Sequence, residues 1–328
     1  RSTKNILDTA SNLISNNSNR VGKKLWSSAN QGELVKLNCY RTGKDEAQGV
    51  SDIIEQKLKK KYSLNDISIL VRAIYQTREF EERFLQVGIG YRVLGGIKFY
   101  VRAEIKDAVS YLRIINQKFD DLALERVIGV PKRGVGESTL NQIYTFGKLN
   151  KLCLEDSILR LLEKDGFKPK IKASLKKLTN MIQKWREDSN HMKHYDLLKL
   201  VLDESGYSSM LKNKKDLENE NRLENLKELL RAMQDYDNLQ NFLEHVALAT
   251  SIDQEWQGAK INLMTMHAAK GLELDVVFLP GWEEGLFPHQ KSIEEKGHNG
   301  LEEERRLAYV GITRAKRNAI ISFSMNRF

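Results

Sequence analysis

The segment Leu263–Pro288 (LMTMHAAKGLELDVVFLPGWEEGLFP) holds the densest group of polar side chains beside apolar runs that predict strands. Because ligands of open parallel sheets bind at the carboxyl ends of the strands, we expect a binding site where the first of these strands ends. Each residue alone also has an ordinary structural explanation, such as a hydrogen-bonded histidine or a lysine at a helix end. Four polar residues are expected at the site: Thr265, His267, Lys270 and Glu273.

A second segment, Glu302–Lys316 (EEERRLAYVGITRAK), predicts a helix that ends in an arginine. Its apolar residues recur on one face, which leaves Arg305 and Arg306 on the other side and Arg314 at the end. An arginine in that place can reach a neighbouring domain's phosphate and neutralise charge that develops on a transferred phosphoryl group. The alternative is an exposed arginine that interacts only with the helix macrodipole.

A third segment, Val130–Thr139 (VPKRGVGEST), combines a glycine-containing turn with the start of a helix. Gly134 and Gly136 permit a tight turn, and Lys132 and Arg133 flank it. Backbone amides of such a turn can bind a phosphate backbone. An ordinary loop before a capped helix would look the same.

Both ends of the chain alternate strands with helices, which predicts right-handed crossovers and a parallel sheet. The N-terminal strands are expected at Leu34–Tyr40, Ile67–Val71 and Tyr91–Leu94, with helices at Lys4–Asn16, Asp45–Lys61 and Thr77–Val87. The C-terminal strands are expected at Ile261–Met266, Val276–Leu279 and Asn318–Ser324, with a helix at Leu301–Thr313.

The middle of the chain shows no strand pattern and predicts only amphipathic helices. The simplest interpretation is one α/β domain, residues 1–105 and 258–328, interrupted by an all-helical insertion, residues 106–257. The alternative is three sequential domains, but a last segment of about 70 residues would make a poor sheet alone. The helices are expected at Glu104–Asn116, Leu122–Ile128, Ser138–Leu149, Leu154–Lys164, Ile171–Asp188, Tyr195–Ser205, Arg222–Tyr236 and Asn238–Ala249.

The composition, with 41% hydrophobic and 30% charged residues among 328, is that of a globular protein. No apolar run approaches the length of a membrane span, so no membrane partner and a cytoplasmic location are expected. The two cysteines, Cys39 and Cys153, form no CxxC or Cys/His cluster, so no metal site is expected. The net charge of +9 suits a polyanionic partner.

The three segments together resemble the UvrD/PcrA/Rep family of superfamily 1 DNA helicases, from Arg1 to Phe328. RSTKNIL resembles the end of the family's QNYRS motif, and TMHAAKGLE and EEERRLAYVGITRAK resemble motifs V and VI. ISILVRA and YRVLGGIKFYVRAEIKDAVSYLR resemble the second motor domain and its exit into the insertion. The resemblance implies a RecA-like (P-loop NTPase-like) domain, 2A, interrupted by a helical domain, 2B, in the C-terminal half of a helicase.

The resemblance implies roles for four residues at a nucleotide. Arg314 and Arg1 match arginines that approach the γ-phosphate of ATP bound between two motor domains. Glu273 matches a residue that contacts the ribose, and Gly271 lies in the same motif. The chain has Leu274 where relatives often have Phe, and no tyrosine precedes Arg1.

The resemblance also implies contacts with DNA. Thr265 and His267 match positions that bind single-stranded DNA, and Arg72 matches a residue near the same strand. Many relatives have Asn at the position of Ile74, which leaves the contact at Arg72 open. A turn in 2B is implied to touch duplex DNA; it comprises Gly134, Val135 and Gly136, with Lys132 and Arg133 beside it.

The chain has no phosphate-binding loop, because none of its Gly-Lys pairs is followed by Ser or Thr. No apolar strand ends in the acidic pair that would coordinate magnesium either. We therefore expect ATP and Mg²⁺ to be held mainly by an N-terminal motor half (1A/1B), and this chain alone to be inactive. The parent would be an ATP-dependent 3′–5′ helicase that acts on single-stranded DNA and its junction with duplex DNA. Partners among repair proteins are possible.

Two other functions remain open from the sequence. The same motor occurs in helicase–nucleases of the AddA/RecB kind, which carry a nuclease domain after motif VI. The second is a stand-alone, non-enzymatic DNA-binding module, in which Arg314 and Glu273 would be idle. A third interpretation, a basic α/β protein with unrelated partners, holds only if the matches to the motif strings are disregarded.

Overall fold

The computed structural model describes all residues except 1, 19–25, 61, 214–215, 252–256 and 328. The chain splits into two compact units, Arg1–Phe99 with Glu255–Phe328 (unit 1) and Tyr100–Gln254 (unit 2). The boundaries at 105/106 and 257/258 stay predictions of where separately folding domains meet. None of the helices within the described ranges is long and apolar enough to cross a membrane.

Unit 1 is built on a six-stranded sheet in the order β1-β6-β5-β2-β4-β3. Every pair of neighbouring strands is parallel, which confirms the predicted α/β fold. The strands are β1 (Lys36–Thr42), β2 (Ile67–Val71), β3 (Tyr91–Leu94), β4 (Ile261–Thr265), β5 (Leu274–Leu279) and β6 (Ala315–Asn326).

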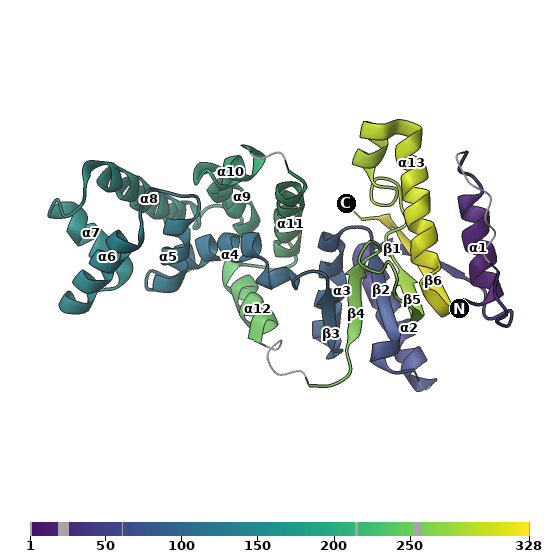
Figure 1. Ribbon diagram of the computed structural model, residues 1–328. Coiled ribbons are helices and arrows are strands. Elements are labelled where there is room, and N and C mark those ends of the chain that lie inside the picture. The colour runs from purple at the N-terminus through teal and green to yellow at the C-terminus, as the bar shows by residue number, and fades with distance from the viewer. Residues whose placement is uncertain (1, 19–25, 61, 214–215, 252–256, 328) are drawn as a thin grey trace. The chain divides into compact units, whose positions relative to one another are not determined.

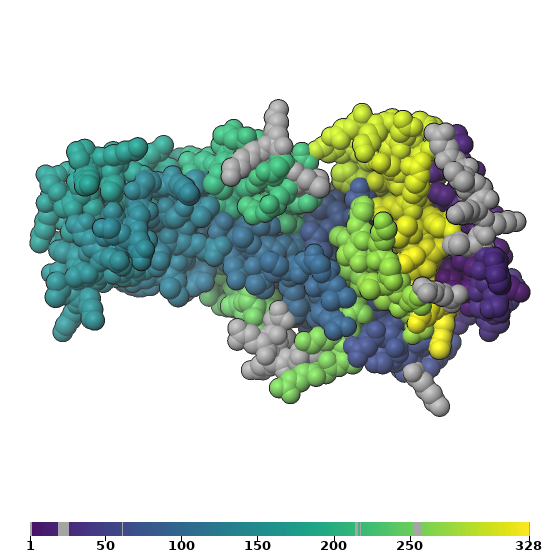
Figure 2. Space-filling view, viewed as in Figure 1, coloured from purple at the N-terminus to yellow at the C-terminus, as the bar shows by residue number. Residues whose placement is uncertain are grey.

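Helices cover both faces of this sheet, as a parallel sheet requires (Figure 1). On one face lie α1 (Lys4–Ile14) and α13 (Gln290–Ile312), which pack against each other and lie side by side in Figure 2. On the other face lie α2 (Gly43–Lys59) and α3 (Thr77–Val87). Because β2 sits between both layers, all of its residues are buried, which explains its continuous apolar run.

Local sequence sets the ends of the helices on the second face. Thr42 and Asp45 form a capping box at the start of α2, in which each side chain accepts a bond from the other residue's backbone N–H. Gly88 ends α3 with a φ of 67°, a left-handed conformation that favours glycine.

Unit 2 is helical throughout its described part, and α4 (Ala103–Asn116) lies at its centre. The ring of Tyr111 on α4 makes edge contacts with Trp185 at 5.9 Å and Tyr207 at 6.4 Å between centroids. The other helices are α5 (Asp121–Gly129), α6 (Glu137–Asn150), α7 (Leu154–Glu163), α8 (Pro169–Asp188), α9 (His194–Glu204), α10 (Tyr207–Asn213), α11 (Leu217–Met233) and α12 (Leu239–Ser251).

Several bounds are shifted by a few residues, as in β1 (predicted at Leu34–Tyr40) and α11 (predicted at Arg222–Tyr236), and two elements differ most from the prediction. Helix α10 was not predicted, because it is short and its buried residues, Tyr207 and Leu211, are too few to show a period. Helix α13 begins at Gln290 rather than Leu301 and contains a non-helical residue, Gly297 (φ 54°, ψ −131°). Its first part is polar and mostly exposed, so it has no apolar stripe to reveal it.

The end of β6 is fixed by a buried arginine. Arg327 forms ion pairs with Glu46 of α2, Glu79 of α3 and Glu283 of the loop after β5. Glu46 is fully buried and also accepts bonds from the Gly281 amide and the Ser322 hydroxyl, at 3.0 and 2.7 Å. Burial opposes the charge of Arg327, but the three carboxylates more than offset it and raise its pKa.

We predict that Arg327→Ala destabilises the protein by about 3–5 kcal/mol, because it leaves the buried Glu46 carboxylate without its cation. Urea unfolding followed by circular dichroism measures the change. Arg317→Ala is the matched control on the same strand, since its side chain is 66% exposed and its pair with Asp275 is long, at 3.5 Å. That control should cost about 0–1 kcal/mol, and equal losses in both variants would refute a special role for Arg327.

Candidate functional site

The segment after β4 crosses the sheet instead of staying at one edge. Thr265 ends β4 beside Val71, at the carboxyl edge of the sheet. Leu274 begins β5 beside Ala315, at the amino edge. Because β4 and β5 are parallel, the chain between them must run back along the sheet, and Glu273 lies at the amino edge. The expectation that Thr265, His267, Lys270 and Glu273 share the carboxyl edge was therefore wrong.

The group at the carboxyl edge is organised by an ion pair. Arg72, just after β2, donates to Glu304 of α13 from Nε (2.9 Å to Oε2) and from Nη2 (2.8 Å to Oε1). Glu304 is buried and also accepts a bond from the His289 amide at 3.1 Å. This two-pronged geometry holds the guanidinium in one plane. An anion that binds Arg72 must compete with Glu304.

His267 lies beside this pair, on the turn that follows β4. Partial burial and the positive charge of Arg72 lower its pKa, while Glu304 acts in the opposite direction. The lowered pKa favours the neutral imidazole, which can donate one hydrogen bond and accept another. The Thr265 hydroxyl accepts a bond from the Ala268 amide at 3.2 Å, which shapes the same turn.

The group at the amino edge surrounds Arg314. Its guanidinium donates to the carbonyl oxygens of Val310 at 3.0 Å and Leu272 at 3.1 Å. Gly271, at a φ of +89°, and Glu273 flank Leu272 on an exposed loop. No carboxylate pairs with Arg314 within the described ranges, so its charge is available to an anion.

The first residues of the chain lie beside the same helix end. The Thr3 amide donates to the Lys316 carbonyl at 3.1 Å, and the Ser2 hydroxyl donates to the Thr313 carbonyl at 3.4 Å. Arg1 itself lies outside the described residues. The resemblance predicts that Arg1 and Arg314 approach the same group, the γ-phosphate of ATP, and for Arg1 this stays a prediction.

The turn in unit 2 separates its two basic residues. Lys132 is exposed, but Arg133 points inward and donates to the carbonyl of Pro131 at 2.9 Å, to the carbonyl of Val127 and to the Tyr111 hydroxyl at 2.8 Å. The Arg133 carbonyl accepts a bond from Ser174 of α8 at 3.0 Å. Arg133 thus fixes the turn from inside.

The glycines of this turn stay open to a ligand. Gly134 adopts a φ of +76°, which favours glycine, and Gly136 caps the start of α6. Both are exposed, and a Cβ atom added to either would meet nothing within 4 Å. Internal crowding therefore explains neither glycine, whereas the positive φ explains Gly134.

Sequence reasoning missed Glu304, Tyr111 and Ser174 as partners of site residues. Glu304 is 232 positions from Arg72 in the chain, so no local pattern could indicate the pair. In the part of the chain that the structure describes, no group of His, Cys, Asp and Glu could hold a metal ion.

Comparisons with known proteins agree on one family. The model of a family described as UvrD-like helicase C-terminal domain matches residues 1–326. Over its full length the chain is 43% identical to a probable DNA helicase II homolog of Rickettsia felis, and it covers 50% of that protein. It is 38% identical to DNA helicase II of Escherichia coli and covers 46% of it. It is 40% identical, over 98% of its length, to the ATP-dependent DNA helicase PcrA of Bacillus subtilis and covers 45% of it. The chain spans about half the length of these relatives.

We predict that nuclear magnetic resonance titration finds the pKa of His267 below its ordinary value of about 6.5. Arg72→Gln should raise it, because a repelling charge is removed, and Glu304→Gln should lower it further. Since the unfolded chain binds this proton more tightly, His267 lowers stability as the pH falls through about 6.5. Unchanged values in both variants would show that the ion pair does not reach the imidazole.

Proposed function

The chain belongs to the family of UvrD-like helicase C-terminal domains, and we propose that it forms the second motor half of an ATP-dependent DNA helicase. The proposed substrate is duplex DNA with a single-stranded tail, unwound in the 3′ to 5′ direction, and the proposed place of action is the cytoplasm. The observation that carries the proposal is the family match over residues 1–326 together with an arginine, Arg314, left free of carboxylate partners in the described structure.

Nucleotide chemistry is proposed for the amino edge. Arg314 would reach the γ-phosphate of ATP and neutralise charge that grows on the phosphoryl group as its bond to the leaving oxygen breaks. The carbonyls of Val310 and Leu272 hold its guanidinium in one orientation, so little freedom remains to be lost when the anion arrives. Glu273 would accept hydrogen bonds from ribose hydroxyls, and Gly271 would let the loop approach the nucleotide closely.

The remaining parts of the nucleotide site are proposed to come from the other motor half. A phosphate-binding loop supplies amides, a lysine and a hydroxyl ligand for Mg²⁺, and none of these is encoded in a matching motif here. Mg²⁺ would neutralise oxygens of the β- and γ-phosphates. The helicase reaction therefore requires both halves, and residues 1–328 alone are proposed to be inactive.

Single-stranded DNA is proposed to bind at the carboxyl edge. Thr265 and His267 are hydrogen-bonding groups at the end of a buried strand, and Arg72 offers a cation once a DNA phosphate displaces Glu304. A neutral His267 fits this role, because it recognises oxygen atoms without adding salt-dependent affinity. Duplex DNA is proposed to contact the turn of unit 2 through Lys132, Gly134, Val135 and Gly136.

We predict that Arg314→Ala in the full-length enzyme lowers DNA-stimulated ATP turnover by roughly 10³- to 10⁵-fold, the range for an arginine that stabilises a phosphoryl-transfer transition state. Steady-state phosphate release measures the loss. Arg317→Ala serves as the control, because Arg317 is an exposed arginine near the start of β6, the strand that directly follows Arg314. Near-normal turnover in Arg314→Ala would contradict the role proposed for it.

We predict different effects for the two basic residues of the turn in unit 2. Lys132→Ala should reduce the slope of log affinity against log salt for a tailed duplex by about 1, because one phosphate contact is lost. Arg133→Ala should weaken binding without changing that slope, since its guanidinium is bonded to the protein. Lys148→Ala, an exposed residue near the end of α6, is the control and should do neither. A reduced slope in Arg133→Ala would mean that Arg133 meets a phosphate directly.

A further inference from the structure

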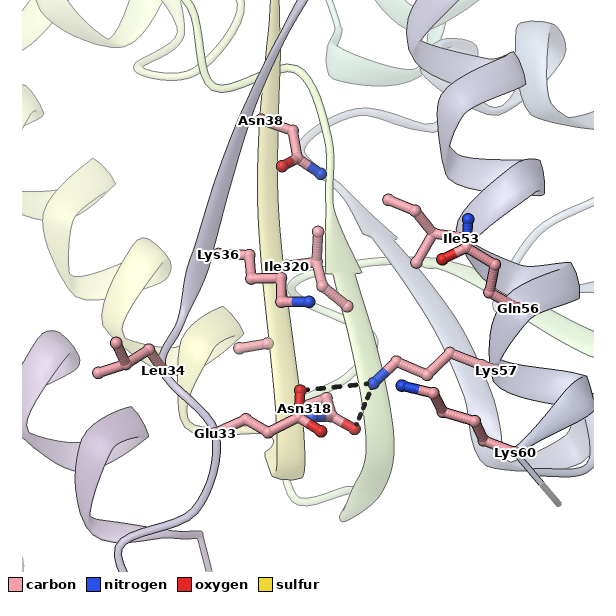
Figure 3. Close-up of a pocket in the computed structure, with 11 residues that line it drawn as sticks. Glu33, Leu34, Lys36, Asn38, Ile53, Gln56, Lys57, Lys60, Asn318 and Ile320 are labelled. Carbon is pink, nitrogen blue, oxygen red and sulfur yellow. Dashed lines mark hydrogen bonds and ion pairs between the residues drawn. The ribbon is translucent and has the colours of Figure 1, made fainter.

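A separate pocket opens at the amino edge of the sheet, between α2 and the starts of β1 and β6 (Figure 3). Its volume is about 170 Å³. The polar groups that line it include Lys57 and Lys60 near the end of α2, Lys36 at the start of β1, Glu33 and Asn318. None of these residues belongs to the proposed nucleotide or DNA sites.

Lys57 is a buried ammonium with unused donors. Its side chain is 8% exposed, and its Nζ lies 2.9 Å from Asn318 Oδ1 and 3.7 Å from Glu33 Oε2. An ammonium has three N–H donors, of which one bonds Asn318, while Glu33 lies beyond hydrogen-bond distance. Its other contact among the described residues is with the face of the Tyr62 ring, 5.5 Å from Nζ to the ring centroid. Burial lowers the pKa of Lys57, and Lys36 and Lys60 lower it further, while Glu33 acts in the opposite direction. A buried cation surrounded by like charge gains from an anion.

Asn318 cannot complete this arrangement. Its Oδ1 already accepts bonds from Lys57 at 2.9 Å and from the Tyr62 hydroxyl at 3.1 Å. Both lone pairs of that oxygen are therefore in use. Among the described residues, Lys57 therefore has no further oxygen acceptor beyond Asn318 and Glu33.

Lys36 and Lys60 add charge that is not neutralised locally. Both are exposed, and neither side chain has a hydrogen bond or an ion pair in the described structure. Three lysines and one glutamate give the pocket a net charge of 3 − 1 = +2. The macrodipole of α2 explains a preference for cations at its end. It does not explain Lys36, which comes from a strand.

We propose that this pocket binds a dianionic phosphate group. The net charge of the lining matches a dianion, and lysines recognise phosphate as point charges with rotatable donors. The shared chemistry fits inorganic phosphate and the terminal phosphate of a monoester, whereas a phosphodiester of DNA carries a single negative charge. The site is independent of the proposed motor function.

The test is isothermal titration of the 328-residue chain with inorganic phosphate at constant ionic strength, with chloride as the balancing anion. We expect saturable binding that weakens about tenfold or more in Lys36→Ala and in Lys60→Ala, as when a hydrogen bond to a charged group is lost. Lys59→Ala is the matched control, because Lys59 is exposed at the same helix end but does not line the pocket. Lys36 and Lys60 are the two exposed lysines of the pocket, so their replacement should not disturb folding.

Titrations with adenosine monophosphate and with a single-stranded oligonucleotide separate the sources of the phosphate. Binding of inorganic phosphate or of the monophosphate that is lost in both pocket variants and kept in Lys59→Ala supports the site. Equal losses in all three variants would show a diffuse effect of charge and overturn it. Binding of the oligonucleotide alone, or no saturation with any ligand, would also overturn it.

Discussion

The parallel pairing of the strands around β2 is the constraint from which the placement of the candidate residues follows. Parallel strands all begin at one edge, so a connection without a helix must still return across the sheet. The short segment between β4 and β5 does this, and it leaves Thr265 and His267 at one edge and Glu273 at the other. The residues of one sequence motif, Thr265–Glu273, therefore lie at two opposite edges of the sheet.

Helix α13 links the same two places. Glu304 on this helix holds Arg72 at the carboxyl edge, and the Val310 carbonyl holds Arg314 at the amino edge. The non-helical residue, Gly297, precedes both contacts, so the part of the helix between them is regular and spans about 9 Å at 1.5 Å per residue. Under the proposed function, one rigid element would touch both the residues that meet DNA and the arginine that meets the nucleotide.

Much of this architecture follows from local sequence, and each exception has a physical cause. The strand Ile67–Val71 was predicted without error, because burial on both faces gives a continuous apolar run. The start of α13 was missed, because its residues are polar and contribute little to a core. The motif strings indicated Arg72 and Arg133, but not that Arg72 is engaged by Glu304 or that Arg133 turns toward Tyr111. Those pairings depend on segments that meet only in the folded chain, so neither spacing nor propensity reveals them.

The position of β6 has a consequence for the order of events during synthesis. Among the described strands, β1 lies at an edge of the sheet with β6 as its one neighbour, and their register joins Lys36 to Ile320. β1 must therefore wait, with its backbone unpaired, while the ribosome adds all of unit 2 and most of the second part of unit 1. Unit 2 is one continuous segment of the chain, and its helices contact one another. It can therefore fold before β6 is made. β1 is thus exposed to wrong strand pairing until β6 has been made, and the exposed Lys36 and Arg41 on β1 are the kind of charged residues that discourage it.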